Sequence, residues 1–146
     1  MKNAKSTEDG IHVWLVLWKA FKTVEKYASQ NIEASGMCQS DFGIMEALLN
    51  KGSLPVSALG VKVLLTSGSI TTAVDRLEKR GWVKRGNDPD DRRSRIVHLT
   101  TEGRTLIRKL FAQHEAAMEK AVAVLEPGQR VMLVDLLKTL GKSLKE

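Results

Sequence analysis

The sequence has little of several features that mark secreted, linker-rich or membrane proteins. It holds a single cysteine, Cys38, so no internal disulfide can form, and only three prolines among 146 residues. No serine- or glycine-rich tract, repeat or low-complexity run is present, which leaves no candidate for a long disordered linker. Residues 1–10 are polar, and the apolar run 13–17 is too short for a signal peptide or a membrane span. We therefore expect a folded cytoplasmic protein with no membrane partner.

Motifs of common catalytic and metal sites are also missing. The chain has no phosphate-cradling glycine loop, no G-x-S-x-G, no H-E-x-x-H and no cysteine paired with a plausible base. His12 and His98 have no metal-ligand spacing. Asp88, Asp90 and Asp91 lack the alternating ligands, central glycine and closing glutamate of a calcium loop. The sequence thus predicts no enzyme, no metal and no cofactor.

Positive charge is in excess and unevenly distributed. The formal net charge is +6, and residues 60–104 hold ten Lys/Arg against six Asp/Glu, a local net charge of +4. Most of the excess therefore lies in less than a third of the chain. Such a concentration permits a polyanionic partner, although many basic proteins have none.

Apolar residues recur every three to four positions in several segments, and each of these segments is predicted to be a helix. The first helix covers residues 11–32 and is apolar on most sides. Ser40 is expected to cap a second helix, which stops near Gly52. Pro55 is expected to open a short third helix that ends around Leu65.

The fourth predicted helix carries the most informative pattern. Thr66 is suited to cap it, and Gly81 ends it. Its apolar face holds Ile70, Ala73, Val74 and Leu77. The opposite face holds Gly68, Thr71, Thr72, Asp75, Arg76 and Lys79. A helix with short hydroxyl side chains in its first turns can enter a DNA major groove closely, while later basic side chains hold the phosphate backbone.

Two short strands follow, at residues 82–85 and 95–99, and a loop rich in turn formers joins them as a β-hairpin. Thr100 or Thr101 is then expected to cap a long helix, and Pro127 to open a last one. Three helices followed by a two-stranded ribbon are typical of a winged helix-turn-helix. The charged loop D-P-D-D-R-R-S-R becomes the wing tip, whose arginines can reach a narrow minor groove. Neighbouring carboxylates can ion-pair with these arginines and hold them extended.

A family resemblance is carried by two segments, L-T-S-G-S-I-T-T-A-V-D-R-L-E-K-R-G-W-V-K-R and D-P-D-D-R-R-S-R-I-V-H-L-T-T-E-G. They resemble the MarR family of bacterial transcription regulators, continuously from about Leu59 to Gly103. The resemblance implies a mainly α fold with a small β-wing (α+β). A winged helix-turn-helix domain at 36–100 would lie between an N-terminal dimerisation helix at 1–35 and C-terminal dimerisation helices at 101–146.

The resemblance also implies a homodimer with interleaved terminal helices that binds a near-palindromic operator on double-stranded DNA, most often as a repressor. The apolar periodicity favours a dimer independently, because terminal helices that are apolar on so many sides have too little partner surface in one 146-residue chain.

Family contacts can be carried over residue by residue. In the recognition helix they fall on Ser67, Gly68, Thr71, Thr72 and Arg76, and Lys79 extends the same basic face. At the wing tip the minor-groove arginine is Arg93, Arg92 and Arg95 are assigned to phosphates, and Asp91 matches the carboxylate that steadies the wing arginine.

Other residues allow more than one interpretation. Trp14, Trp18, Cys38 and His114 are candidates for contacting a small aromatic or anionic effector. Dimer packing explains the two tryptophans equally well, and a hydrogen-bonded position in the dimer core is the alternative for His114. Cys38 precedes the second helix, where the positive helix end would favour its thiolate if the side chain is exposed. Cys38 could therefore make the protein a redox-sensing regulator, and the alternative is that Cys38 is a small buried residue of the core. A further alternative keeps the fold but uses the basic surface for a protein or RNA partner.

Overall fold

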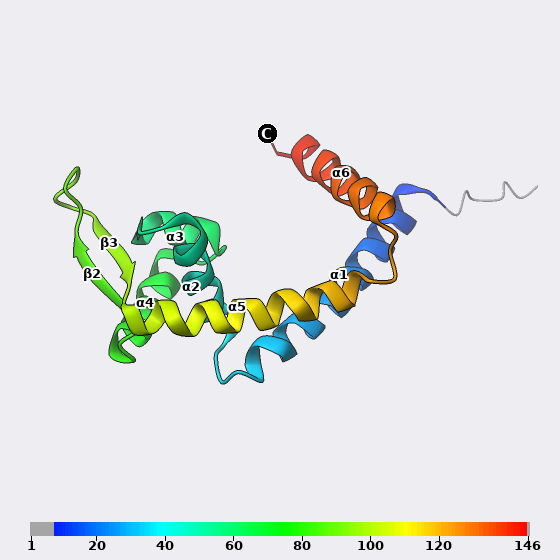
Figure 1. Ribbon diagram of the computed structural model, residues 1–146. Helices are drawn as coiled ribbons and strands as arrows, with labels where there is room; N and C mark the ends of the chain where they lie inside the picture. The colour runs from blue at the N-terminus through cyan, green and yellow to red at the C-terminus, as the bar shows by residue number, and fades with distance from the viewer. Residues whose placement is uncertain (1–7, 146) are drawn as a thin grey trace, which may run out of the picture.

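The computed structural model describes residues 8–145 and is mostly helical, with one small sheet (Figure 1). The elements in chain order are α1 (Gly10–Glu33), α2 (Gln39–Lys51), β1 (Leu54–Pro55), α3 (Val56–Lys62), α4 (Ser67–Lys79), β2 (Val83–Asn87), β3 (Arg95–Leu99), α5 (Thr101–Val122) and α6 (Pro127–Ser143).

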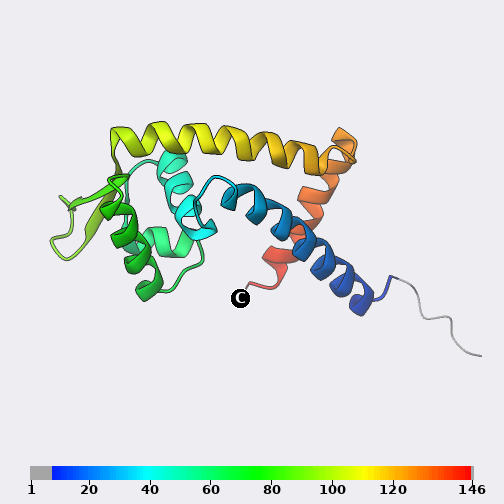
Figure 2. The same cartoon turned by 90° about the horizontal axis from the view of Figure 1, so that it is seen from below.

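The molecule is elongated and has two ends of different construction (Figures 1 and 2). One end gathers α2, α3, α4 and the sheet, and the β2–β3 hairpin projects from it. The long helix α5 begins beside this winged domain and runs to the other end, where it lies beside α1. Helix α6 packs extensively against no other described element. The predicted mainly α fold with a β-wing is confirmed.

The sheet is antiparallel, with strand order β1-β3-β2. In the hairpin, Val83 lies opposite Leu99 and Asn87 lies opposite Arg95. The short strand β1, which the sequence did not reveal, adds Leu54 opposite Val97 on the other side of β3. The wing is therefore attached to the domain along its base and is free at its tip.

A single apolar core holds the winged domain together. Its members come mainly from α2, α3, α4, both hairpin strands and the first half of α5, and Ile32 at the end of α1 and Met37 before α2 complete it. The fully enclosed members include Ile44, Leu48, Leu59, Val74, Leu77, Val97 and Ile107. Burial of each such side chain contributes roughly 1.5–3 kcal/mol. Since α4 supplies Ile70, Ala73, Val74 and Leu77 to this core, its predicted apolar face is confirmed.

Several helix boundaries follow the predicted signals. The Thr66 hydroxyl accepts a hydrogen bond from the backbone N–H of Ser69 at 3.2 Å, and that of Thr100 accepts from Gly103 at 3.0 Å. Pro127 occupies the first turn of α6. These residues fix where α4, α5 and α6 begin.

Other predicted boundaries are wrong. Cys38, not Ser40, is the N-cap residue of α2, and its side chain makes no capping hydrogen bond. Pro55 lies in β1 and precedes α3, which ends at Lys62 because Leu64 turns the backbone with a φ of +58°. Strand β2, predicted at residues 82–85, begins at Val83 and continues to Asn87, because pairing with β3 extends it into the predicted loop.

The backbones of α5 and of the segment that begins the hairpin approach each other closely. A Cβ atom on Gly103 would lie 2.0 Å from the carbonyl oxygen of Trp82. The Thr100 N–H also donates to this oxygen at 3.0 Å, and the Thr100 hydroxyl donates to the Gly81 carbonyl at 2.6 Å. Only glycine fits at position 103, and this contact sets the wing's base against α5.

The helical end exposes many large apolar side chains, whereas most of those in the winged domain are buried. On α1 the exposed large apolar residues are Ile11, Val13, Trp14, Leu15, Val16, Trp18, Phe21, Val24 and Tyr27. On α6 they are Val131, Met132, Leu133, Val134, Leu136, Leu137 and Leu140. Within residues 8–145 no single helix has the length and apolar content needed to cross a membrane, and α3 with α4 meets that criterion only jointly, across a 109° bend.

Candidate nucleic-acid interface

The exposed face of α4 is the first part of the interface. Ser67, Gly68, Thr71, Thr72 and Lys79 are all exposed on this helix, opposite the face that joins the core. The first turn of α4 lies at the helix end that carries partial positive charge, where the Thr66 hydroxyl already accepts from the Ser69 N–H. The predicted separation of the two faces is therefore confirmed.

The threonine hydroxyls of this face are oriented by the helix itself. Thr71 donates to the Ser67 carbonyl at 2.9 Å, and Thr72 donates to the Gly68 carbonyl at 3.0 Å. With the hydroxyl hydrogen engaged in this way, each oxygen presents lone pairs to the outside, beside the methyl group. Such a side chain can accept from the amino group of adenine or cytosine and can pack on the thymine methyl.

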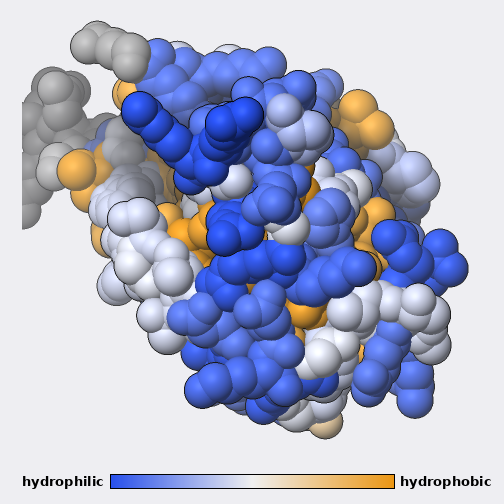
Figure 3. Space-filling model, turned by 90° about the vertical axis from the view of Figure 1, so that its left-hand side faces the viewer, coloured by the Kyte–Doolittle hydropathy of each residue, from blue (hydrophilic) through white to orange (hydrophobic). Residues whose placement is uncertain are grey.

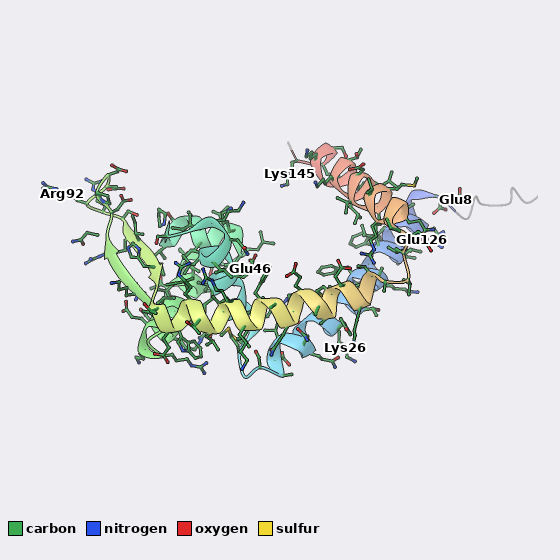
Figure 4. All side chains as sticks on the ribbon, in the orientation of Figure 1. Glu8, Lys26, Glu46, Arg92, Glu126 and Lys145 are labelled. Atoms are coloured by element: carbon green, nitrogen blue, oxygen red, sulfur yellow. The ribbon has the colours of Figure 1, made fainter. Side chains whose placement is uncertain are left out.

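The wing tip is the second part. Arg92 lies at the free end of the hairpin (Figure 4), and Arg93 and Arg95 are exposed beside it. Viewed from the wing side of the molecule, the surface is predominantly hydrophilic (Figure 3). A hollow between α3, α4 and the wing separates the two parts, and Ser67, Thr71, Arg85 and Arg93 are among its lining residues.

The wing carboxylates organise the backbone rather than the arginine side chains. Asp91 accepts a hydrogen bond from the backbone N–H of Arg93 at 2.9 Å, and Asp88 accepts from that of Asp90 at the same distance. Among the described residues, neither Arg92 nor Arg93 forms an ion pair. The expected pairing of tip acids with tip arginines is thus absent, and Asp91 acts as a turn former.

Arg85 joins the wing to the recognition helix. Its guanidinium donates to Glu78 at 3.2 Å, to Asp75 at 2.5 Å and to the Thr71 carbonyl at 3.3 Å. Its backbone N–H also donates to Glu78 at 2.9 Å. Because these partners lie along α4 and Arg85 lies on β2, the network fixes the wing relative to the helix, and the single positive charge of Arg85 is shared by two carboxylates near the interface.

Arg76 lies on the exposed face of α4 but turns its guanidinium toward α2. Nε donates to one oxygen of Asp41 at 2.9 Å and Nη2 donates to the other at 2.5 Å. Asp41 is 2% exposed. These hydrogen bonds, which the Asp41 carboxylate accepts, raise the pKa of Arg76 above its ordinary value. Nη2 also lies 3.9 Å from the sulfur of Cys38, which is exposed.

The residues predicted to contact an effector are not brought together. Trp14 and Trp18 are exposed on α1, and Cys38 lies at the start of α2. His114 is half-buried on α5, where Nδ1 lies 3.1 Å from the Asn31 side-chain oxygen and the ring stacks edge-on against Phe42. Burial lowers the pKa of His114, and the negative charge of Glu46 partly offsets this lowering. None of these four side chains lines the hollow of about 700 Å³ between α1, α2 and the α3–α4 turn.

Two residues that shape the interface, Asp41 and Arg85, were missed by sequence reasoning. Asp41 is three, four and seven positions before Ile44, Met45 and Leu48, so it lies within the apolar stripe of α2. Arg85 shares a strand face with buried Val83. A charged residue on an apolar face signals a buried partner, but the spacing does not name that partner.

Comparison with known proteins identifies this arrangement. The MarR family model matches residues 39–94, which span α2 to the wing. The transcriptional regulator MhqR of Bacillus subtilis is 31% identical over 96% of this chain and 97% of its own length. The chain belongs to the MarR family. It is a DNA-binding transcriptional regulator with a winged helix, and regulators of this family are not enzymes.

Solved structures of similar proteins, among them a MarR-family regulator, have the same fold. Sco3205 from Streptomyces coelicolor, whose structure is a complex with DNA, superposes with a TM-score of 0.85 at 27% identity, over 97% of this chain and 94% of that one. BpsR of Bordetella bronchiseptica, described by its regulation of DNA binding by 6-hydroxynicotinic acid, superposes with a TM-score of 0.77 at 25% identity, over 88% of this chain and 98% of that one.

Proposed function

We propose that this MarR-family regulator is a homodimeric, ligand-responsive repressor that binds a near-palindromic operator. Each subunit would insert α4 into a major groove and its wing tip into the adjacent minor groove. The observation that carries this proposal is the shared outward exposure of the α4 hydroxyl face and the arginine-tipped hairpin, held together by Arg85. As a chromosome-binding protein it would act in the bacterial cytoplasm.

Specific residues take specific roles in this proposal. Ser67, Gly68, Thr71 and Thr72 address base edges, where short side chains permit close approach. Arg93 enters the minor groove, and the phosphate contacts are Lys79, Arg92 and Arg95. Asp91 orients the wing through the backbone of Arg93. Arg76 lies on the same face, with Nη1 left for a phosphate after Nε and Nη2 bind Asp41.

The proposed dimer would be formed by residues 1–35 and 101–146 and would flank the winged domain at 36–100. The support is the apolar surface exposed on α1 and α6, together with the lack of extensive packing of α6 against any other described element. Contiguous apolar patches of this kind mark protein–protein contacts, and a two-fold axis would pair each patch with its own copy. The two-fold symmetry of the dimer would then match the palindrome of the operator.

Ligand response is proposed by analogy with BpsR, whose DNA binding is regulated by a small aromatic acid. A comparable compound would bind between the winged domain and the dimer helices, near Trp14, Trp18 and His114, after a partner copy completes the site. It would lower DNA affinity by favouring a different separation of the two wings. The name of another relative, the repressor MdtR of Bacillus subtilis, agrees with a repressing role.

The test is a fluorescence-anisotropy titration of the full chain against the duplex upstream of its own coding region and against a random duplex. We expect a preference of about 1,000-fold or more for one inverted repeat. Equal affinity for both duplexes would contradict operator binding. Adding benzoate, phenol or 6-hydroxynicotinate should release the operator, and no release together with no thermal shift would contradict the ligand response.

A redox response is the second candidate, and one observation favours it. Cys38 is exposed at the start of α2, with its sulfur 3.3 Å from the Ser40 hydroxyl and 3.9 Å from Arg76. If oxidation of this thiol regulates binding, hydrogen peroxide should release operator DNA from the native chain and not from Cys38→Ser. Equal release from both proteins would contradict this candidate.

A further inference from the structure

We propose that Arg76 is a positioning residue, which fixes recognition helix α4 on α2 through Asp41, rather than a group whose main contribution is contact with DNA. This inference rests on the proposed DNA interface, because it assigns a role within it. It changes the expectation from the family pattern, in which this arginine is a direct contact.

The geometry of the pair is the first argument. Asp41 is the buried charged residue among those described, at 2% exposure, and each of its oxygens accepts one hydrogen bond from the Arg76 guanidinium. Two parallel N–H donors on two carboxylate oxygens form the bidentate arrangement that is most demanding in orientation. Helix α4 must therefore lie where this fork reaches Asp41.

The environment of Asp41 is the second argument. It lies in the first turn of α2, where the helix end favours negative charge, and its neighbours Phe42, Ile44 and Met45 are buried in the core. An acid in such surroundings is costly when its partner is lost. The carboxylate therefore binds Arg76 firmly, and displacing α4 from α2 would leave it without that partner.

The position of Arg76 on α4 is the third argument. Thr72 is one turn before it and Gly68 one turn earlier, so all three lie along one row of the helix. Anchoring the row at Arg76 sets the rotation of α4 about its axis, and hence the direction in which Thr72 faces. With Nε and Nη2 bound to a carboxylate, the pair has little net charge, so a phosphate contact by the remaining Nη1 contributes little to affinity.

The decisive variant is Arg76→Lys, which keeps the positive charge and loses the bidentate fork. We expect its operator affinity to fall about tenfold at every salt concentration, with the slope of log K against log salt unchanged. The matched control is Lys79→Gln on the exposed face of the same helix, which should reduce that slope by about 0.9. Wild-type affinity in Arg76→Lys, or a reduced slope in it, would overturn the positioning role.

A second measurement does not depend on DNA. Hydrogen exchange of the α4 amides around Gly68 to Thr72 should be faster in Arg76→Lys and Asp41→Asn than in the native chain, and unchanged in Lys79→Gln. Native exchange rates in Arg76→Lys would also overturn the inference. If the native chain does not prefer its operator over random duplex, the proposed interface fails, while this exchange measurement still decides the role of Arg76 in holding α4.

A mutant cycle separates the remaining alternative. Asp41 is too buried to touch DNA, so weaker operator binding by folded Asp41→Asn must act through α4. For a positioning pair, Asp41→Asn with Arg76→Gln should bind no more weakly than the weaker single variant. Fully additive losses would show that Arg76 contacts DNA on its own and would contradict the proposal.

Discussion

The winged domain and the helical end differ in where their apolar side chains lie. In the winged domain, α4 buries Ile70, Val74 and Leu77 and exposes hydroxyl and basic groups. At the helical end, α1 and α6 have the same helical periodicity but leave Trp14, Leu137 and many similar residues exposed. Periodicity alone therefore identifies the apolar face of a helix, whereas the structure shows which faces one chain can cover by itself.

The largest expected effect comes from charging the apolar face of α6. Leu137→Asp should dissociate the proposed dimer, because a charge on an interface core is not compensated. A monomer loses the second half-site, so operator affinity should fall on the order of 100-fold. Light scattering and anisotropy would measure both. Lys138→Asp, one position away and exposed, is the matched control, and a dimeric Leu137→Asp protein would contradict this division of the molecule.

The polar end can be tested at the wing tip. Arg93→Ala should weaken operator binding by about 1–3 kcal/mol, since one groove-reading side chain is lost. Thermal unfolding should stay unchanged, because the Arg93 side chain is exposed. Lys84→Ala, exposed on β2 away from the tip, is the control. Full operator affinity in Arg93→Ala would remove Arg93 from the interface.

The next prediction concerns stability at the junction between the wing and α5. Gly103→Ala would place a methyl group 2.0 Å from the Trp82 carbonyl oxygen, so the wing base and α5 must separate. We expect unfolding free energy to fall by about 1–3 kcal/mol, measured by urea titration. Gly128→Ala, whose added methyl group meets nothing within 4 Å, should not destabilise the protein. Equal stability of the two variants would contradict the close contact.

The smallest expected effect is a pH dependence at the joint between the two ends, where His114 of α5 meets Asn31 of α1 and Phe42 of α2. Burial lowers the pKa of His114 below the ordinary value of a histidine. Its contribution to stability is therefore present above the unfolded pKa and is lost as pH falls through the folded pKa. Urea titrations across this window should show a shallower pH slope in His114→Gln than in the native chain, with His12→Gln as control. An unchanged slope in His114→Gln would contradict the effect.

The elements that sequence predicted well are those with local signals. The Thr66 and Thr100 caps, the Pro127 helix start and the two faces of α4 depend on residues within one or two turns. The failures depend on partners distant in sequence. Strand β1 exists because Leu54 pairs with Val97. Arg76 turns inward because it hydrogen-bonds to Asp41, a residue 35 positions away in the sequence. At the wing, charge counting found the acids but did not distinguish backbone from side-chain partners.

The contacts of Arg85 have a consequence for how operators of this protein can vary. Arg85 of β2 is hydrogen-bonded to three positions along α4. The distance between the two DNA-reading parts of one subunit, α4 and the wing, is therefore fixed. Base pairs read within a half-site must keep a constant separation. Variation in operator architecture, and any adjustment by an effector, is then confined to the distance between the two half-sites.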